Sequence, residues 1–262
     1  MGFSKFKLTA AGIMLAAHFS ANAAMPVYAQ DQTVSTVQDV MRYANELHLA
    51  YIKSPETRVN DNAHRGLTEV AAGLVERTSV EPKGVVGLDI ENDDLLFFPF
   101  IYWPVSENTE SLSPAAQTKV QHYLNNGGVI LFDVRDQSIG LSESPALRRI
   151  LGGLAIDPLV QLDKDHNLMR AHYLLSQMKG SSHGKNIWVE APLSANGKRV
   201  SSVIISQENW SSAWRGLTHA KGSDGHKQAI RAGVNMVLYA LTGDYKSDAI
   251  HTPTIDFKRT PR

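Results

Sequence analysis

The residues of this chain best suited to chemistry are Asp133, Arg135 and Asp136, which directly follow the apolar run 129–132. Two carboxylates on one loop can act as general acid and base if their environments separate their pKa values, and an arginine can bind an anionic group through two hydrogen bonds. Alternatively, Arg135 pairs with one of the acids and stabilises the loop. The cluster predicts a ligand-binding edge of the fold, at which Asp133 and Asp136 are also candidate catalytic residues.

Aromatic residues are expected beside this cluster, in the segment FFPFIYWP that ends at Pro104. Most of them are expected in the core, because alternate residues of a buried strand pack on the two faces of a sheet. Tyr102 and Trp103, however, stand where the strand is expected to end, near Asp133. With Trp210 from another segment they predict the wall of a site for a sugar or peptide. A hydrophobic lid over the core is the alternative.

Residues 180–184, with the sequence GSSHG, match the G-x-S-x-G pattern of serine hydrolases. A nucleophile of that type sits on a sharp turn between a strand and a helix. Here a Gln-Met-Lys segment precedes the motif, and a strand is expected to follow it. The context therefore favours a loop over a catalytic Ser182.

The segment DKDHN at 163–167 resembles the start of a calcium loop. Such a loop needs glycine at its sixth position and glutamate at its twelfth, where this chain has Leu168 and Leu174. His166 and His172 do not have the spacing of a zinc protease. We interpret the segment as an exposed, hydrogen-bonded turn, and we predict no metal and no cofactor.

Helices and strands alternate along the chain and must position these residues. Ser113 and Pro114 begin a helix, because the serine hydroxyl accepts a free backbone N–H and proline lacks a donor the first turn does not use. Asn126-Gly127-Gly128 ends it, and the run 129–132 is typical of a buried parallel strand. Further strands are expected at 47–52, 85–90, 95–101, 187–190 and 200–205, and further helices at 37–44, 60–78, 144–151 and 226–241, while 173–175 fits either. This order predicts an α/β fold with a mostly parallel sheet covered on both faces.

The first residues of the chain have the pattern of a secretory signal peptide. Lys5 and Lys7 precede a mostly apolar stretch at 8–17, and Val27-Tyr28-Ala29 offers a cleavage site, with Ala23 as a second. The stretch is too short for the roughly 20 residues of a membrane span. We therefore expect export to the periplasm or the medium, with no membrane span left after cleavage.

The remaining sequence is expected to form a single domain. A leader with a short N-terminal helix occupies 30–46, the α/β domain 47–251 and a polar tail 252–262. The 26 basic and 26 acidic residues balance, and removing Lys5 and Lys7 leaves a small negative net charge, which gives no electrostatic case for nucleic acid. The chain has no cysteine, which excludes every cysteine-nucleophile mechanism.

Several blocks of sequence resemble an uncharacterised bacterial domain family. They are LHLAYI (47–52), RTSVEP (77–82), DLLFFPFIYWPV (94–105), NNGGVILFDVRDQ (125–137), LRRILGGL (147–154), IWVEAP (187–192), ENWSSAW (208–214) and GVNMVLYALTGDYKSD (233–248). This family is a domain of unknown function, often found C-terminal to aerotolerance-regulator-type membrane regions. The resemblance covers residues 47–251 and implies a flavodoxin-like three-layer sandwich similar to the class I glutamine amidotransferases. Those enzymes attack glutamine with a cysteine, so the fold does not carry that activity to this chain.

Three functions are compatible with these patterns. The first is a non-catalytic domain that binds a small polar ligand, or a protein partner of the cell envelope, through Tyr102, Trp103, Asp133, Arg135, Asp136 and Trp210. The second is a hydrolase of envelope carbohydrate or amide bonds that uses Asp133 or Asp136 with His166, and it requires these groups to meet in one pocket. The third is a structural assembly module, which should expose an apolar patch away from the strand ends.

Overall fold

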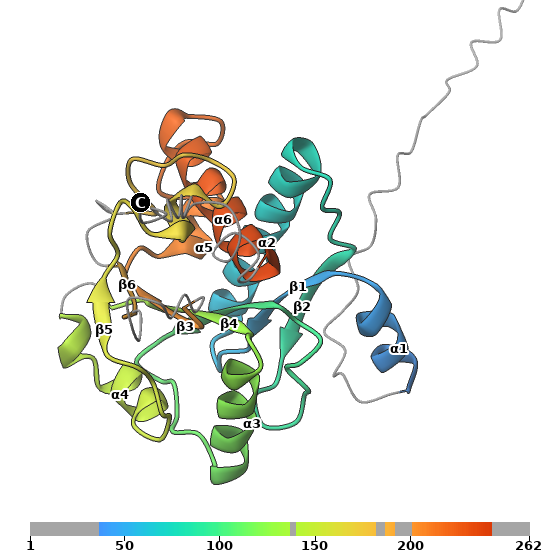
Figure 1. The fold of residues 1–262 in the computed structure, drawn as a ribbon, viewed down its shortest axis with the longest axis vertical. Coiled ribbons are helices and arrows are strands. Elements are labelled where there is room, and N and C mark those ends of the chain that lie inside the picture. The colour runs from blue at the N-terminus through green and yellow to red at the C-terminus, as the bar shows by residue number, and fades with distance from the viewer. Residues whose placement is uncertain (1–36, 137–139, 182–186, 192–200, 243–262) are drawn as a thin grey trace, which may run out of the picture.

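The computed structural model describes residues 37–136, 140–181, 187–191 and 201–242 (Figure 1). The strands are β1 (His48–Ile52), β2 (Gly84–Leu88), β3 (Phe100–Val105), β4 (Val129–Val134), β5 (Leu159–Gln161), β6 (Ile187–Glu190) and β7 (Val203–Ser206). The helices are α1 (Val37–Asn45), α2 (Thr57–Arg77), α3 (Pro114–Asn125), α4 (Pro145–Leu151), α5 (Trp210–Trp214) and α6 (Asp224–Thr242), with short 3-10 turns η1 (Leu141–Glu143) and η2 (Asn167–Arg170). The proposed signal peptide, the tail and Ser182 lie outside the described residues.

The strands form one seven-stranded sheet in the order β2-β1-β3-β4-β7-β6-β5. Every pair from β2 to β7 in that order is parallel, and β6 and β5 continue the sheet in antiparallel fashion. The expected α/β fold with a mostly parallel sheet is therefore confirmed. The central strands are continuous apolar runs because helices cover both of their faces.

Two helical layers enclose the sheet (Figure 1). Helices α2, α5 and α6 pack with Leu131 and Ile204 on one face, which we call the α6 side. Helices α3 and α4 pack with Ile130, Phe132 and Ile205 on the other, the α3 side. Neighbouring strand residues thus point into different cores, as the pleat of a strand requires.

The helix predicted from Ser113 is present as α3. The Ser113 hydroxyl accepts a hydrogen bond from Ala116 N at 3.1 Å, and Gly127 has a φ of +85° in the turn that leads into β4. That turn brings the ring of Tyr123 over the backbone, where its hydroxyl donates to Phe98 O at 2.7 Å. The start and stop signals of this helix were therefore sufficient to predict it.

Strand β3 lies further along the chain than predicted. Residues 95–98 form a turn, in which Phe98 N donates to Leu95 O at 3.1 Å, and the strand continues past Pro104 to Val105. Arg135 N donates to Val105 O, so the backbone N–H and C=O groups of Val105 point toward β4. These groups alternate in direction along a strand, so the backbone of Pro104 points toward β1. Pairing with β1 ends at Tyr102, and the missing N–H of the proline therefore has no ladder bond to lose.

The segment 173–175 is neither strand nor helix. Asn235, a fully buried residue of α6, accepts hydrogen bonds from His172 N and Tyr173 N and donates to Leu168 O and Tyr173 O. One buried amide thus replaces regular backbone pairing for this loop and fixes it to the helix.

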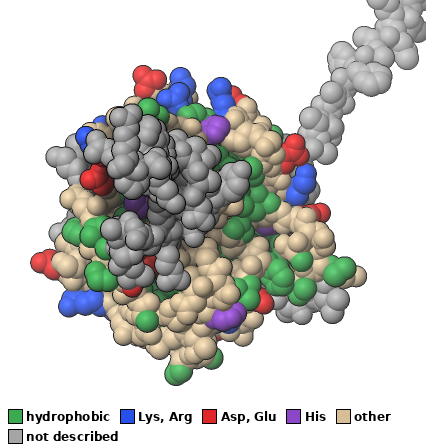
Figure 2. All heavy atoms as spheres, in the orientation of Figure 1, with side chains coloured by type: hydrophobic (Ala, Val, Ile, Leu, Met, Phe, Trp, Pro, Cys, Tyr) green, Lys and Arg blue, Asp and Glu red, His purple; other side chains and the backbone are tan. Residues whose placement is uncertain are grey.

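The surface carries mixed charge and no membrane-spanning helix is present among the described residues. Figure 2 shows Lys and Arg interspersed with Asp and Glu over the face in view. None of the described helices combines the length and apolar character that crossing a bilayer would need.

Close packing of α2 against α5 depends on Gly66. A Cβ there would lie 2.8 Å from Ser211 O and 3.0 Å from Ser211 Cα. We expect Gly66→Ala to lower the free energy of unfolding by about 1–3 kcal/mol, since backbone must shift to make room. Urea unfolding followed by circular dichroism measures the change.

Gly73→Ala is the matched control on the same helix. A Cβ at Gly73 would lie 2.7 Å from the side-chain Cγ2 of Ile230 and 3.4 Å from that of Val234, so it meets side chains and not backbone. Alanine also has the higher helix propensity. The control should lose less stability than Gly66→Ala, and an equal loss in both variants would contradict a backbone clash.

Candidate functional site

The carboxylate of Asp133 lies buried at the end of β4 and is held by three donors. Its Oδ2 accepts the Tyr102 hydroxyl at 2.8 Å and Trp210 N at 2.7 Å, and its Oδ1 accepts Asn209 N at 3.1 Å. The residue is 0 % exposed. The side chain therefore ties β3 and β4 to the start of α5.

Burial has a strong effect on the ionisation of this group. Desolvation raises the pKa of Asp133 to about 7, against the opposing effects of the hydrogen bonds from Tyr102 and Trp210 and of the Arg135 charge. The pKa of the Tyr102 hydroxyl is likewise raised well above its ordinary value, by burial and by the nearby carboxylate. Asp133 is thus poised to change charge near neutral pH inside the core.

The aromatic residues predicted to contact a ligand are buried. Trp210 stacks on Trp214 with ring centroids 5.8 Å apart, and Tyr102 meets the edge of Trp214 at 5.3 Å. Trp103 points to the other side of the sheet and stacks on Phe132. None is more than 2 % exposed. A ligand-binding role for Tyr102, Trp103 and Trp210 stays a prediction that this arrangement does not favour.

Arg135 and Asp136 lie nearer the surface than Asp133. Both are partly buried, and the Nη1 atom of Arg135 is buried without a hydrogen-bond partner among the described residues. The backbone oxygen of Asp136 accepts from Gln207 Nε2 at 2.8 Å. These contacts place the two residues at the carboxyl edge of the sheet, where ligands of open α/β folds bind.

A small pocket opens at this edge, beyond the ends of β3 and β4, and we call it the strand-end pocket. Its cavity volume is about 290 Å³, and its lining residues are Val105, Ser106, Glu107, Val134, Asp136, Ser144, Pro145, Ala146 and Arg149. The guanidinium of Arg149 donates to Glu107 O at 2.6 Å and to Thr109 O at 2.9 Å. Ser106 is 6 % exposed, and its hydroxyl has no hydrogen-bond partner among the described residues. The lining residues therefore include a cation, a carboxylate and Ser106, whose buried hydroxyl is unpaired.

A second feature of this edge is the turn that joins β7 to α5. Asn209 has φ 46° and ψ 53° and is the one non-glycine residue with positive φ in the described part of the chain. Asparagine tolerates this conformation better than most residues. Glu208 before it is fully buried, with Oε2 accepting Gly180 N at 3.0 Å. In α/β-hydrolases the nucleophile sits in a similar position, on a residue with strained backbone between a strand and a helix.

Comparison with known proteins decides the family. A family model described as Domain of unknown function (DUF4159) matches residues 48–241, from β1 to the end of α6. The chain belongs to the DUF4159 family. A search of curated proteins found no match. The expected relationship to an uncharacterised domain family is therefore confirmed, and the match spans the whole sheet.

In this DUF4159 domain His166 immediately precedes η2, and its ring contacts Leu168 and Tyr239, not the strand-end acids. Its Nδ1 accepts from Leu168 N at 3.2 Å, its ring lies 5.7 Å from that of Tyr239 on α6, and burial lowers its pKa. The segment around it is a hydrogen-bonded turn, with Asp165 N donating to Asp163 Oδ1 at 2.8 Å. Over the described residues no group of three or more metal-binding side chains comes together. These contacts do not favour the predicted pairing of His166 with Asp133 or Asp136.

Sequence patterns missed several residues of this edge. Ser106 and Arg149 become noticeable only when the chain folds, because one is defined by a missing partner and the other reaches back to residues 107 and 109. Asn209 carried a signal, since asparagine between a strand and a helix favours a left-handed turn.

The buried Asp133 predicts a specific pH dependence of stability. Its pKa in the folded state is raised to about 7 from 3.8, so the native state holds an extra proton between these values. Its stabilising contribution is complete below pH 3.8 and is lost as the pH rises through 7. We expect the free energy of unfolding of the wild type to fall, relative to Asp133→Asn, by up to about 4 kcal/mol between pH 4 and 8.

Urea unfolding of both proteins across this range measures the difference. The asparagine keeps the shape of the side chain but cannot titrate, so its own curve reports all other groups. Parallel curves for the two proteins would contradict a raised pKa.

Tyr102→Phe, which removes one of the three donors to Asp133, should lower the free energy of unfolding by about 1–3 kcal/mol.

Proposed function

We propose that this DUF4159 domain is an exported, non-catalytic binding domain, and that its ligand is a small hydroxylated molecule held in the strand-end pocket. The observation that carries the proposal is the buried Ser106 hydroxyl. Leaving such a group unpaired costs about 1–3 kcal/mol, and an unsatisfied group at a pocket wall is satisfied when a ligand binds.

The charges around Ser106 support a polar ligand. Asp136 lines the same pocket as Arg149, so both a hydrogen-bond acceptor and a cation can meet the ligand. A cavity of about 290 Å³ is at the small end of ligand sites and has room for a single sugar ring. A carboxylate accepts hydrogen bonds, and a serine hydroxyl both donates and accepts them. Such groups pair well with the hydroxyl groups of a ligand, so we infer a sugar-like molecule of the cell envelope.

We further infer that the fold is of the class I glutamine amidotransferase-like type, as the sequence blocks indicate. The same blocks lead us to infer an association of the family with aerotolerance-regulator-type regions. The turn at Asn209 supports the inferred fold, because it joins a strand to a helix, as does the turn that carries the cysteine in those enzymes. Asparagine is not a nucleophile of that kind. A binding function is therefore favoured over hydrolysis.

Ligand binding can be tested by a thermal-shift screen of the chain from Gln30 against envelope sugars, peptidoglycan fragments and nucleotides. We expect a sugar-like compound to raise the melting temperature of the wild type. Ser106→Ala removes only the hydroxyl, so it should weaken that compound by about two- to ten-fold with little effect on the melting temperature of the free protein.

Ser142→Ala is the matched control, because Ser142 is exposed and lies outside the strand-end pocket. Its affinity for the compound should equal that of the wild type. A compound that binds Ser106→Ala and Asp136→Asn as tightly as the wild type would place its site elsewhere and refute the proposed pocket.

Export is a separate test. Expression of the full sequence in a bacterial host should yield protein in the periplasm or medium, and mass spectrometry should find Gln30 at its N-terminus. A product that keeps residues 1–29 and stays in the cytoplasm would contradict export. Replacing Lys5 and Lys7 by glutamate should slow processing, because the positive region of a signal peptide is lost.

A further inference from the structure

A larger pocket lies on the α3 side of the sheet, next to its β5 edge, and we call it the leucine pocket. Its cavity volume is about 600 Å³, within the range of small-molecule sites. It is lined by Gly140, Leu141, Ser142, Leu147, Arg148, Leu151, Gly152, Leu159, Trp188, Ile205 and Gln207. It shares none of these residues with the strand-end pocket, so it is a second site.

The leucine pocket lies between helix α4 and strands β5, β6 and β7. Ile205 and Trp188 are paired across β7 and β6 and point to the same face of the sheet, and Leu159 follows on β5. The single helix opposite them, α4, has 7 residues and supplies Leu147 and Leu151. Apolar side chains of strand and helix therefore face each other across open space, and Trp188 remains 37 % exposed.

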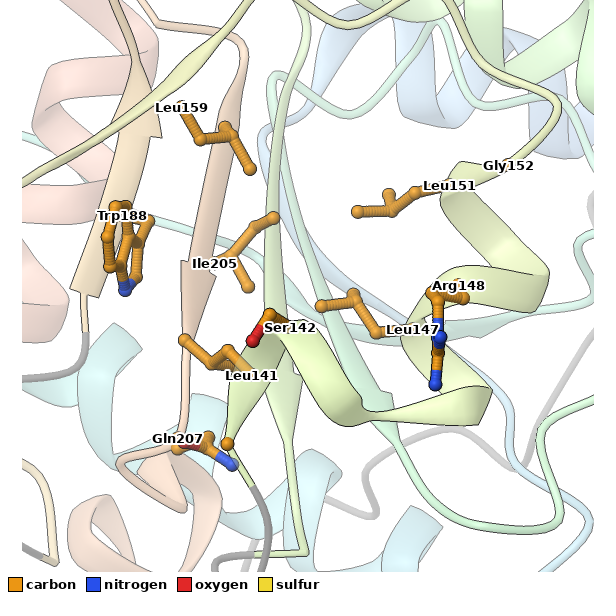
Figure 3. A pocket seen from close by; sticks show the side chains of 11 residues that line it. Leu141, Ser142, Leu147, Arg148, Leu151, Gly152, Leu159, Trp188, Ile205 and Gln207 are labelled. Atoms are coloured by element: carbon orange, nitrogen blue, oxygen red, sulfur yellow. The ribbon is translucent and has the colours of Figure 1, made fainter.

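The two ends of the pocket differ in polarity. Figure 3 shows Leu159 and Leu151 toward one end, and Gln207 with the guanidinium of Arg148 toward the other. The amide of Gln207 is held by its bond to Asp136 O at 2.8 Å, and Arg148 donates from Nη2 to Glu143 O at 3.0 Å. Arg148 is the one charged residue among the described lining residues, and the carboxylate of Glu143 lies next to the lining residue Gly140.

We propose that the leucine pocket binds an amphipathic carboxylate, with its apolar body between the sheet and α4 and its carboxylate at Arg148. Apolar walls favour an apolar ligand body, because its burial removes apolar surface from water. A single cation beside the pocket then sets the orientation of the ligand. An arginine pairs well with a carboxylate because its planar N–H groups match the two oxygens. This site does not depend on the proposed sugar site.

The test uses decanoate and its neutral counterpart decanol, both below their aggregation concentrations, with the purified protein. Binding is followed by isothermal titration calorimetry and by the fluorescence of tryptophan, since Trp188 lines the site. We expect saturable binding of both ligands with the carboxylate binding more tightly. Arg148→Gln should weaken decanoate by about three-fold and leave decanol unchanged, because a solvent-exposed ion pair contributes modestly.

Leu159→Arg and Val160→Arg form the matched pair that locates the site. Leu159 faces the pocket, whereas Val160 is its exposed neighbour on β5 and points to the opposite face. Leu159→Arg should abolish binding of both ligands and Val160→Arg should preserve it, with circular dichroism confirming that both variants are folded. Trp188→Ala, also in the pocket, should weaken both ligands if Leu159→Arg does not fold.

The outcomes separate this proposal from the proposed function. Absence of saturable binding by the wild type, or equal loss in the Leu159 and Val160 variants, would overturn the leucine pocket as a ligand site. Equal weakening of decanoate and decanol by Arg148→Gln would overturn the role of the cation. Ser106→Ala should leave decanoate binding unchanged, so failure of the sugar site would leave this result intact.

Discussion

The rest of the structure depends on one buried carboxylate. Asp133 ends β4 inside the core and satisfies the Tyr102 hydroxyl of β3 together with two backbone N–H groups at the start of α5. The Tyr102 hydroxyl and Trp210 N are both buried, and leaving either without an acceptor would cost about 1–3 kcal/mol. Because the carboxylate fixes where α5 begins, it also fixes the stacked Trp210 and Trp214 and the close contact of α5 with α2 at Gly66. One side chain thus links the sheet to the helical layer on its α6 side.

This arrangement divides the carboxyl edge of the sheet into a closed and an open part. Over β4 and β7 the turn at residues 207–209 and helix α5 cover the strand ends, and Asp133 lies beneath them. Beyond the ends of β3 and β4, Ser106, Asp136 and Arg149 line the strand-end pocket. Two aspartates three positions apart therefore meet different environments. The inner one is buried in the core, and the outer one lines the strand-end pocket.

The sequence predicted local features better than those that depend on distant contacts. Ser113-Pro114 and the Asn-Gly-Gly stop predicted α3 and the strand after it, because caps and breakers act within a few residues. The end of β3 was placed too early, because whether Pro104 ends a strand depends on the strand beside it. Alternation indicates which face Tyr102 occupies, but not that Trp214, more than a hundred residues later, packs against its ring. Whether a residue at a strand end is exposed thus depends on segments that are distant in the sequence. Ser106 and Arg149 were missed for the same reason.

The strained turn at Asn209 also has a physical explanation without catalysis. A left-handed conformation at a non-glycine residue costs of order 1–3 kcal/mol, so it persists only where the surroundings impose it. Here the turn directs two consecutive N–H groups, those of Asn209 and Trp210, onto the same carboxylate. The gain from satisfying a buried Asp133 offsets the strain of the turn. The left-handed turn therefore has a structural role in burying Asp133, and that role requires no nucleophile at this position.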